Sequence, residues 1–290
     1  MASPTASRAA ASQPLLPDEI LEDIFLLLES AADLARASAT CRSFRRVATS
    51  RRFLRRFSSL HPPPIVGVVG YGLHPVDTAD KAASAARAIT QAGDFTFSFL
   101  PNPIRDWTVH DVRDGRVLLS RPGAVDTNPL ELMVCDPLYR RYVQIPPISG
   151  YLVPRMPSRN EMKSEPFLAP AGDEEEDQHF RVMYNFVSTY KIVCLVFSVA
   201  TGKWCGATSF SFLPARLIER PKRLARYYAR SCFYWVAEIE KYMLMLDPCE
   251  MKFSLIELLH ERNRRINCSE LGVMDAAEGR LGLIALGTRK

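Results

Sequence analysis

The residue types used for acid–base, nucleophilic or metal chemistry are scattered along this chain. The histidines and cysteines form no CxxC pair and no Cys/His cluster with zinc-site spacing. Hydrolase, zinc-protease and phosphate-loop signatures (GxSxG, HExxH, GxxxxGKS/T) are also missing. His110 beside Asp111 could form a general base with an orienting carboxylate. However, adjacent residues of a strand point to opposite faces, so we expect no catalytic residue, no metal site and no cofactor.

The cysteines indicate a reducing compartment instead. They are seven in number, widely spread and mostly within apolar runs such as IVCLVF, which is typical of buried free thiols. No apolar run approaches the roughly 20 residues that span a bilayer, and the first residues lack the apolar core of a secretory signal. We therefore expect an intracellular protein, cytoplasmic or nuclear, that does not contact a membrane.

A stretch rich in arginine is the next feature that could bind a ligand. Eight of the arginines lie within residues 36–56, and no acidic residue occurs in residues 34–76. Interleaved with three phenylalanines, these arginines could bind nucleic acid or phosphate. The alternative, which we favour, is the solvated face of a helical module, so we do not expect nucleic acid as the partner. The acidic run 173–177 predicts a solvated loop.

The arginines follow a segment with helical periodicity. Pro17 suits the first turn of a helix, and Asp18 and Glu19 suit the positive end of its dipole. A wide apolar stripe follows at Ile20, Leu21, Ile24, Phe25, Leu27 and Leu28.

Further short helices are predicted downstream. Ser30 and Asp33 have the spacing of a capping box that opens a second helix. Two more helical segments carry Cys41 and Phe44, and then Phe53 and Phe57, and the run HPPP stops the pattern. Such a small bundle cannot bury the whole stripe, so the surplus faces either the rest of this chain or another protein.

The segment LPDEILEDIFLLLESAADLARASATCRSFRRVATSRRFLRRF resembles an F-box, specifically those of large plant families with β-rich C-terminal regions. The resemblance implies that this helical hook inserts into the Skp-type adaptor of a Skp–cullin–F-box ubiquitin ligase. It departs from the family pattern at three positions, with Phe44 for Trp, Thr40 for Val and Glu29 for Pro. The implied adaptor-binding residues are Leu16, Pro17, Ile20, Leu21, Ile24, Phe25, Leu28, Leu34, Cys41 and Phe44.

After the proline stop, short apolar runs separated by Gly, Pro, Asp and Asn predict many short strands. The expected strands are Ile65–Val69, Phe95–Leu100, Trp107–Val112, Val117–Ser120, Leu132–Cys135, Arg181–Val187, Lys191–Phe197, Cys232–Ala237, Tyr242–Leu246 and Phe253–Leu258. This texture is typical of a sandwich, barrel or propeller.

A weak internal repeat favours the propeller. The segments LMVCDPLYRRYVQI, CLVFSVATGKWCGA and MLMLDPCEMKFSLI each have an apolar strand, a polar residue (Asp136, Ser198 and Asp247) and a turn. A basic residue and then an aromatic residue follow at the fifth and sixth positions after the polar one. The pattern predicts hairpins repeated at about the length of a propeller blade.

Several short segments of this region also resemble the β-propeller-like domain that follows the F-box in those plant proteins. They include DGRVLLS, VCDPLYRRYVQIPP, CFYWV and EGRLGLIAL. In that family the domain is the substrate receptor. Because residues 65–290 suffice for about five blades, we expect either a small, irregular propeller or a truncated one with an open edge.

The resulting prediction is an α+β protein with four parts. They are a disordered leader (1–13), a helical F-box module (14–60), a proline linker (61–64) and an all-β, propeller-like substrate-recognition domain (65–290). The expected function is non-catalytic: the F-box docks the adaptor, and through it cullin, while the β domain recruits an unknown protein substrate for ubiquitination. The alternatives are a stand-alone ligand- or nucleic-acid-binding propeller with a basic helical cap, and a truncated, non-functional relative.

Overall fold

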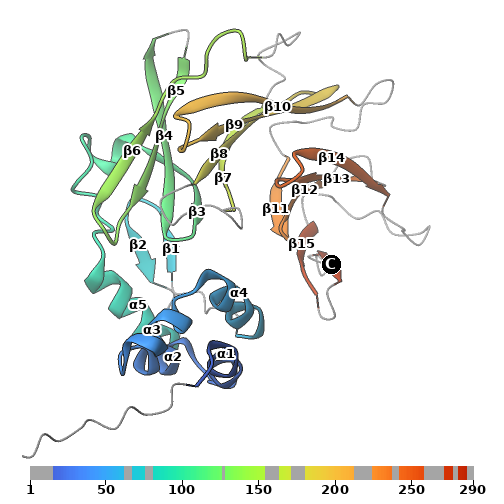
Figure 1. Ribbon diagram of the computed structural model, residues 1–290. Coiled ribbons are helices and arrows are strands. Elements are labelled where there is room, and N and C mark those ends of the chain that lie inside the picture. The colour runs from blue at the N-terminus through green and yellow to red at the C-terminus, as the bar shows by residue number, and fades with distance from the viewer. Residues whose placement is uncertain are drawn as a thin grey trace, which may run out of the picture. The chain divides into compact units, whose positions relative to one another are not determined.

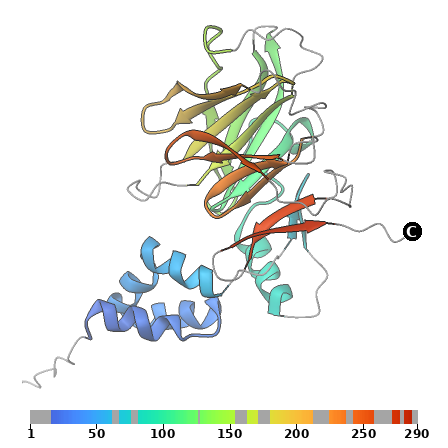
Figure 2. The same ribbon diagram turned by 90° about the vertical axis from the view of Figure 1, so that its right-hand side faces the viewer.

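The structure is a computed structural model in which the chain divides into two compact units, residues 1–66 and 67–290 (Figures 1 and 2). It describes residues 16–61, 67–75, 81–125, 128–153, 163–170, 180–211, 224–236, 242–257, 271–276 and 280–285. In the described residues no helix is long and apolar enough to cross a membrane.

The described residues of the first unit form four short helices, α1 (Asp18–Leu26), α2 (Ala31–Ser38), α3 (Arg42–Ala48) and α4 (Arg51–Leu60). The residue before each of the last three helices accepts a hydrogen bond from a backbone N–H of the first turn. Ser30 caps α2, as its spacing from Asp33 predicts, Cys41 caps α3 and Ser50 caps α4. Each of these caps starts a helix within a few residues of the end of the preceding one, so the helices are joined by short connections.

One apolar core holds the four helices together. Its buried members are Leu21, Phe25, Leu34, Val47, Ala48, Phe53 and Phe57. The Phe25 ring lies edge-on to Phe53 at 6.1 Å between centroids, and His61 closes the end of α4 by stacking on Phe57 at 4.4 Å. Edge-to-face packing adds to the burial of such rings and fixes the helices at their crossing points.

The described part of the second unit is built from antiparallel sheets, and within each sheet the strands pair in the order of the sequence. Three sheets have four strands each: sheet I is β3 (Thr108–Arg113), β4 (Arg116–Val125), β5 (Asn128–Asp136) and β6 (Arg141–Ile145); sheet II is β7 (Lys163–Ala169), β8 (Arg181–Val187), β9 (Lys191–Ser198) and β10 (Lys203–Ser211); sheet III is β11 (Arg226–Ala229), β12 (Cys232–Val236), β13 (Tyr242–Asp247) and β14 (Lys252–Glu257). This up-and-down, four-stranded order is the topology of a propeller blade. The predicted class, a helical N-terminal region followed by a β-rich region, is therefore confirmed.

Two smaller sheets and two helical segments complete the second unit. The two-stranded sheets are β1 (Gly67–Val69) with β2 (Leu73–Pro75), and β15 (Leu271–Asp275) with β16 (Leu281–Ala285). Helix α5 (Lys81–Ala92) and a 3₁₀ turn, Ile104–Asp106, lie between β2 and β3 in the chain.

The repeat found in the sequence is the last hairpin of each four-stranded sheet. Its polar residue pairs with the basic residue five positions later: Asp136 with Arg141, Ser198 with Lys203, and Asp247 with Lys252. Asp136 Oδ1 accepts a hydrogen bond from Tyr139 N at 3.2 Å, and Asp247 Oδ1 accepts one from Cys249 N at 2.8 Å. Both aspartates therefore bond into the turn of their hairpin.

Apolar side chains pack between successive sheets. One buried cluster joins sheets I and II, including Leu132, Ile145 and Leu195. A second joins sheets II and III through Phe167, Phe233 and Trp235, with Phe167 and Phe233 ring centroids 4.7 Å apart. Figures 1 and 2 show the three sheets following one another in chain order, from green through yellow to orange-red.

A network of charges connects the first strands of these sheets. Arg226 of β11 lies 3.0 Å from Glu165 of β7 and 3.3 Å from Asp111 of β3, and all three side chains are at least four-fifths buried. The guanidinium also lies over the Phe167 ring, 4.4 Å from its centroid. Burial lowers the pKa of Arg226, and the facing carboxylates of Glu165 and Asp111 act in the opposite direction.

Three expectations from the sequence need correction. Residues Phe95–Leu100 form turns and no strand: Asp94 accepts a hydrogen bond from Thr96 N at 3.1 Å, and Phe97 has a positive φ of 57°. Helix α5 was not predicted at all. The thiols are not mostly buried either: Cys135 and Cys194 are, whereas Cys41, Cys205 and Cys249 are exposed. Cys268 and the acidic run 173–177 lie outside the described residues.

Candidate protein-docking surface

Helix α1 has two apolar faces, of which only one is used inside the first unit. Leu21 and Phe25 lie in the helical core, each at most 3% exposed. Leu16, Ile20 and Ile24 are each at least 44% exposed; Leu16 precedes the helix, and the spacing of four residues places Ile20 and Ile24 in one row on it. The row is the surplus that the sequence predicts, and apolar residues at this spacing are typical of a helix that contacts a second protein.

Leu27 extends this row and was missing from the predicted set. It is the C-cap residue of α1 and is 82% exposed. The periodicity of the stripe already included Leu27, but a stripe alone does not distinguish residues that face the core from those that face away. We call Leu16, Ile20, Ile24 and Leu27 the α1 apolar row.

The predicted adaptor-binding residues therefore separate into three groups. Leu16, Pro17, Ile20, Ile24 and Cys41 are exposed. Leu28 and Phe44 are partly buried, and Leu21, Phe25 and Leu34 are buried in the helical core. The buried residues can act on a partner only by holding the exposed ones in place.

Phe44 and Cys41 position the start of α3. The Phe44 ring meets Phe25 edge-on, with centroids 5.2 Å apart and planes at 81°. Phe44 also donates its backbone N–H to Cys41 Sγ at 3.4 Å. One side of the Phe44 ring thus packs against the core, while the rest of the ring is exposed at the surface.

The arginines of this unit are partly neutralised by acids of α1 and α2. Arg46 pairs with Asp18 at 2.7 Å, Arg56 pairs with Glu22 at 3.0 Å, and Arg36 pairs with Asp33. These ion pairs are mostly solvent-exposed and contribute little to stability. In the described part of the chain, ion-pair partners are lacking for Arg42, Arg45 and Arg52. The side chains of Arg51 and Arg55 lie outside the described residues.

In the second unit, the pair His110–Asp111 does not form a catalytic arrangement. His110 sits at a β-bulge of β3, where its Nε2 lies 2.6 Å from Ser120 Oγ. The Asp111 carboxylate instead accepts a hydrogen bond from Leu168 N at 3.0 Å and pairs with Arg226. Burial lowers the pKa of His110, and the carboxylate of Glu165 acts in the opposite direction. Ser120 is itself buried, so this serine is not presented to a substrate.

Across the described ranges, no three His, Cys, Asp or Glu side chains gather where a metal ion could bind.

Two comparisons with known proteins give a match. Residues 14–59 match the protein family described as F-box-like. Among solved structures, the WD40 domain of SCAP from fission yeast is similar, at 13% identity and a TM-score of 0.36. The match covers 63% of this chain and 41% of that one, so this chain spans about two fifths of the length of the structure it matches.

The comparison with curated proteins gives no match. The residues matched by the family include the buried core of the helices and the α1 apolar row. The chain thus carries an F-box-like domain at residues 14–59, followed by a β-rich unit of antiparallel sheets.

Proposed function

We propose that this protein is the substrate-recognition subunit of a Skp–cullin–F-box ubiquitin ligase. The observation that supports the proposal best is the α1 apolar row within an F-box-like domain. Fully burying a leucine or isoleucine contributes about 1.5–3 kcal/mol. Four such residues in one row would therefore supply much of the free energy for docking onto a Skp-type adaptor.

The protein contributes proximity in this scheme and performs no bond-making step. The F-box-like domain holds the adaptor, and through it cullin, while the β-rich unit holds a protein substrate. Tethering both raises the effective concentration of substrate lysines near the activated ubiquitin. For the domain boundaries we propose those expected from the sequence: a leader at 1–13, the F-box module at 14–60, a proline linker at 61–64 and the recognition domain at 65–290.

The test is capture of a purified Skp-type adaptor by the full chain. Replacing Ile20 and Ile24 together by Asp places two charges in the α1 apolar row, whereas neither residue belongs to the helical core. We expect capture to fall at least about a hundredfold, because each buried charge would be unpaired. The control is Leu60→Asp, which introduces a charge at an exposed leucine of α4.

Capture by the control should equal that of the unaltered chain. If the Ile20→Asp, Ile24→Asp variant still captured the adaptor, docking through α1 would be wrong. A stand-alone binding protein with a helical cap predicts no adaptor capture by any variant, including the unaltered chain.

A further inference from the structure

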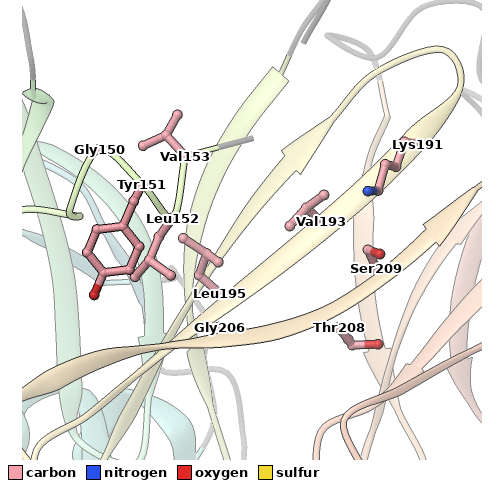
Figure 3. A pocket seen from close by; sticks show the side chains of 10 residues that line it. All are labelled: Gly150, Tyr151, Leu152, Val153, Lys191, Val193, Leu195, Gly206, Thr208 and Ser209. Carbon is pink, nitrogen blue, oxygen red and sulfur yellow. The ribbon is translucent and has the colours of Figure 1, made fainter. Parts of the chain in front are cut away.

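Sheet II carries an open groove on the face that it turns toward the loop after β6. The groove has a volume of about 620 Å³, within the range of ligand sites. Figure 3 shows its residues: Gly150, Tyr151, Leu152 and Val153 from the loop, Lys191, Val193 and Leu195 from β9, and Gly206, Thr208 and Ser209 from β10.

The loop that forms one wall is held firmly against the sheet. Trp204 of β10 donates its indole N–H to Pro146 O at 2.7 Å, and Leu152 N donates to Ser149 O at 2.8 Å. Leu152 and Val153 pack on the buried cluster between sheets I and II. The wall is therefore part of the folded unit.

The two ends of the groove differ in chemistry. Leu152, Val153 and Leu195 make one end apolar, and Lys191 with Ser209 makes the other end polar (Figure 3). The Lys191 ammonium is turned toward Val193 and has no ion-pair partner in the part of the chain that the structure describes. A half-buried cation beside an apolar floor favours a ligand with an anionic group next to an apolar one.

The openness of the groove indicates what kind of molecule carries these two groups. Gly150, Tyr151, Gly206 and Ser209 are exposed, whereas a small-molecule ligand is usually enclosed on most sides. An extended polypeptide fits such a groove better, because its backbone can remain at the surface. Lys191 and Val193 are two residues apart on one strand, about 7 Å, and side chains two apart on an extended ligand have the same spacing.

We propose that this groove binds an extended protein segment in which a carboxylate side chain and an apolar side chain lie two residues apart. The carboxylate pairs with Lys191, and the apolar side chain lies between Leu152, Val193 and Leu195. Only one part of this inference rests on the proposed function, namely that the bound segment belongs to a protein that the ligase ubiquitinates. Binding itself requires no adaptor.

The experiment uses an oriented peptide library in which Glu and Leu are fixed two positions apart, in both orders, and all other positions are randomised; we call it the Glu/Leu library. Parallel libraries fix Lys in place of Glu, or Ser in place of Leu. The Glu/Leu library should retain at least about threefold more of the full chain than either other library does. A ratio of this size is expected for the loss of one partly exposed ion pair or one partly buried side chain.

Lys191→Glu is the decisive variant, because it should transfer the preference from the Glu/Leu to the Lys/Leu library. Its matched control is Lys203→Glu, an exposed lysine of β10 outside the groove, which should retain the original preference. Gly206→Phe should abolish retention by all libraries. A Cβ at Gly206 would meet only Leu152 Cδ2, at 3.9 Å, so the ring fills the groove and does not enter the core.

Equal retention of all libraries by the unaltered chain would overturn the proposal, as would an unchanged preference in Lys191→Glu. If a thermal melt shows that Gly206→Phe is not folded at the assay temperature, the change of preference in Lys191→Glu alone decides whether the groove binds the segment. Adaptor capture is measured on the same preparations. The groove variants should keep it, and the Ile20→Asp, Ile24→Asp variant should lose it while retaining the Glu/Leu preference, so the two proposals can fail separately.

Discussion

Arg226 donates a hydrogen bond from Nη1 to Glu165 Oε1 at 3.0 Å, although the two residues are 61 positions apart. Each lies on the first strand of its sheet, and Arg226 also pairs with Asp111 on the first strand of sheet I. One guanidinium therefore connects three sheets. Removing one partner of a buried ion pair leaves the other charge uncompensated, which is more damaging than losing the attraction itself.

We expect Arg226→Met to lower the free energy of unfolding of the second unit by about 3 kcal/mol. All three tryptophans, Trp107, Trp204 and Trp235, lie in this unit, so tryptophan fluorescence in urea measures it selectively. Arg121→Met is the control, because Arg121 and Glu131 also pair, at 2.7 Å, but within sheet I and with greater exposure. Arg121→Met should lower the free energy of unfolding by only about 1 kcal/mol. Equal losses in both variants would contradict a special role for Arg226.

His110 makes the stability of the second unit dependent on pH. Burial lowers its pKa from the usual 6.5, so below that pH the unfolded chain binds a proton before the folded one does. The free energy of unfolding therefore falls as the pH decreases through the window below 6.5, and is unaffected above it. His110→Gln can still hydrogen-bond to Ser120 but does not titrate.

The measurement compares urea unfolding of the two proteins at about pH 8 and about pH 5. The unaltered chain should lose more stability over this interval than His110→Gln, and the difference is the contribution of the imidazole. Identical losses would show that His110 takes up its proton equally well in the folded state.

The thiols should separate into two classes toward iodoacetamide. Cys41, Cys205 and Cys249 are exposed and should react in the native protein. Cys135 and Cys194 should react only after unfolding, because both are buried and burial raises the pKa of Cys135 to about 12. Bound adaptor should protect Cys41 alone, as judged by mass spectrometry. Protection of Cys205 instead would place the adaptor on the second unit.

Phe44→Trp should strengthen adaptor capture, because a larger ring exposes more apolar surface while its inner edge remains against Phe25. Phe44→Ala should weaken capture and lower the stability of the first unit by about 2 kcal/mol, roughly half the effect at a fully buried phenylalanine. Titration with the adaptor and thermal unfolding measure the two effects. A decrease in affinity for Phe44→Trp would mean that the docking surface has no room at this position.

Adaptor binding should be nearly insensitive to salt, since the α1 apolar row is uncharged. Nucleic-acid binding through Arg42, Arg45 and Arg52 would instead make affinity fall steeply and linearly in a log–log plot against salt concentration. Titrations over a range of sodium chloride concentrations, with the adaptor and separately with a DNA duplex, distinguish the two. A steep slope for the adaptor would move the contact from the apolar row to the arginines.

Local features of the fold could be predicted from the sequence because they depend on residues close together in the chain. The hairpins at Asp136 and Asp247 follow from an acidic residue that can bond into the next turn. The helix starts follow from capping residues such as Ser30.

Features that depend on distant residues could not be predicted. Strand β7 contains Pro166, which argues against a strand, and the structure tolerates it because β7 is at the edge of sheet II. Helix α5 is rich in alanine and offers no strong apolar stripe. The separation of α1 into buried Leu21 and exposed Ile20 depends on where α3 and α4 pack, which periodicity within α1 does not contain.

The charge network also has a consequence for the order in which the protein is made. Asp111 and Glu165 leave the ribosome well before Arg226, so sheets I and II are complete while their two carboxylates still lack the guanidinium. At this stage Glu165 is already paired with Lys163 at 3.0 Å, whereas the ion-pair partner of Asp111 is still missing, so a nascent chain holds Asp111 in water or folds at an energetic disadvantage. Sheets I and II should therefore gain their final stability only when β11 has been synthesised, and premature termination before Arg226 should yield chains that quality-control proteases recognise.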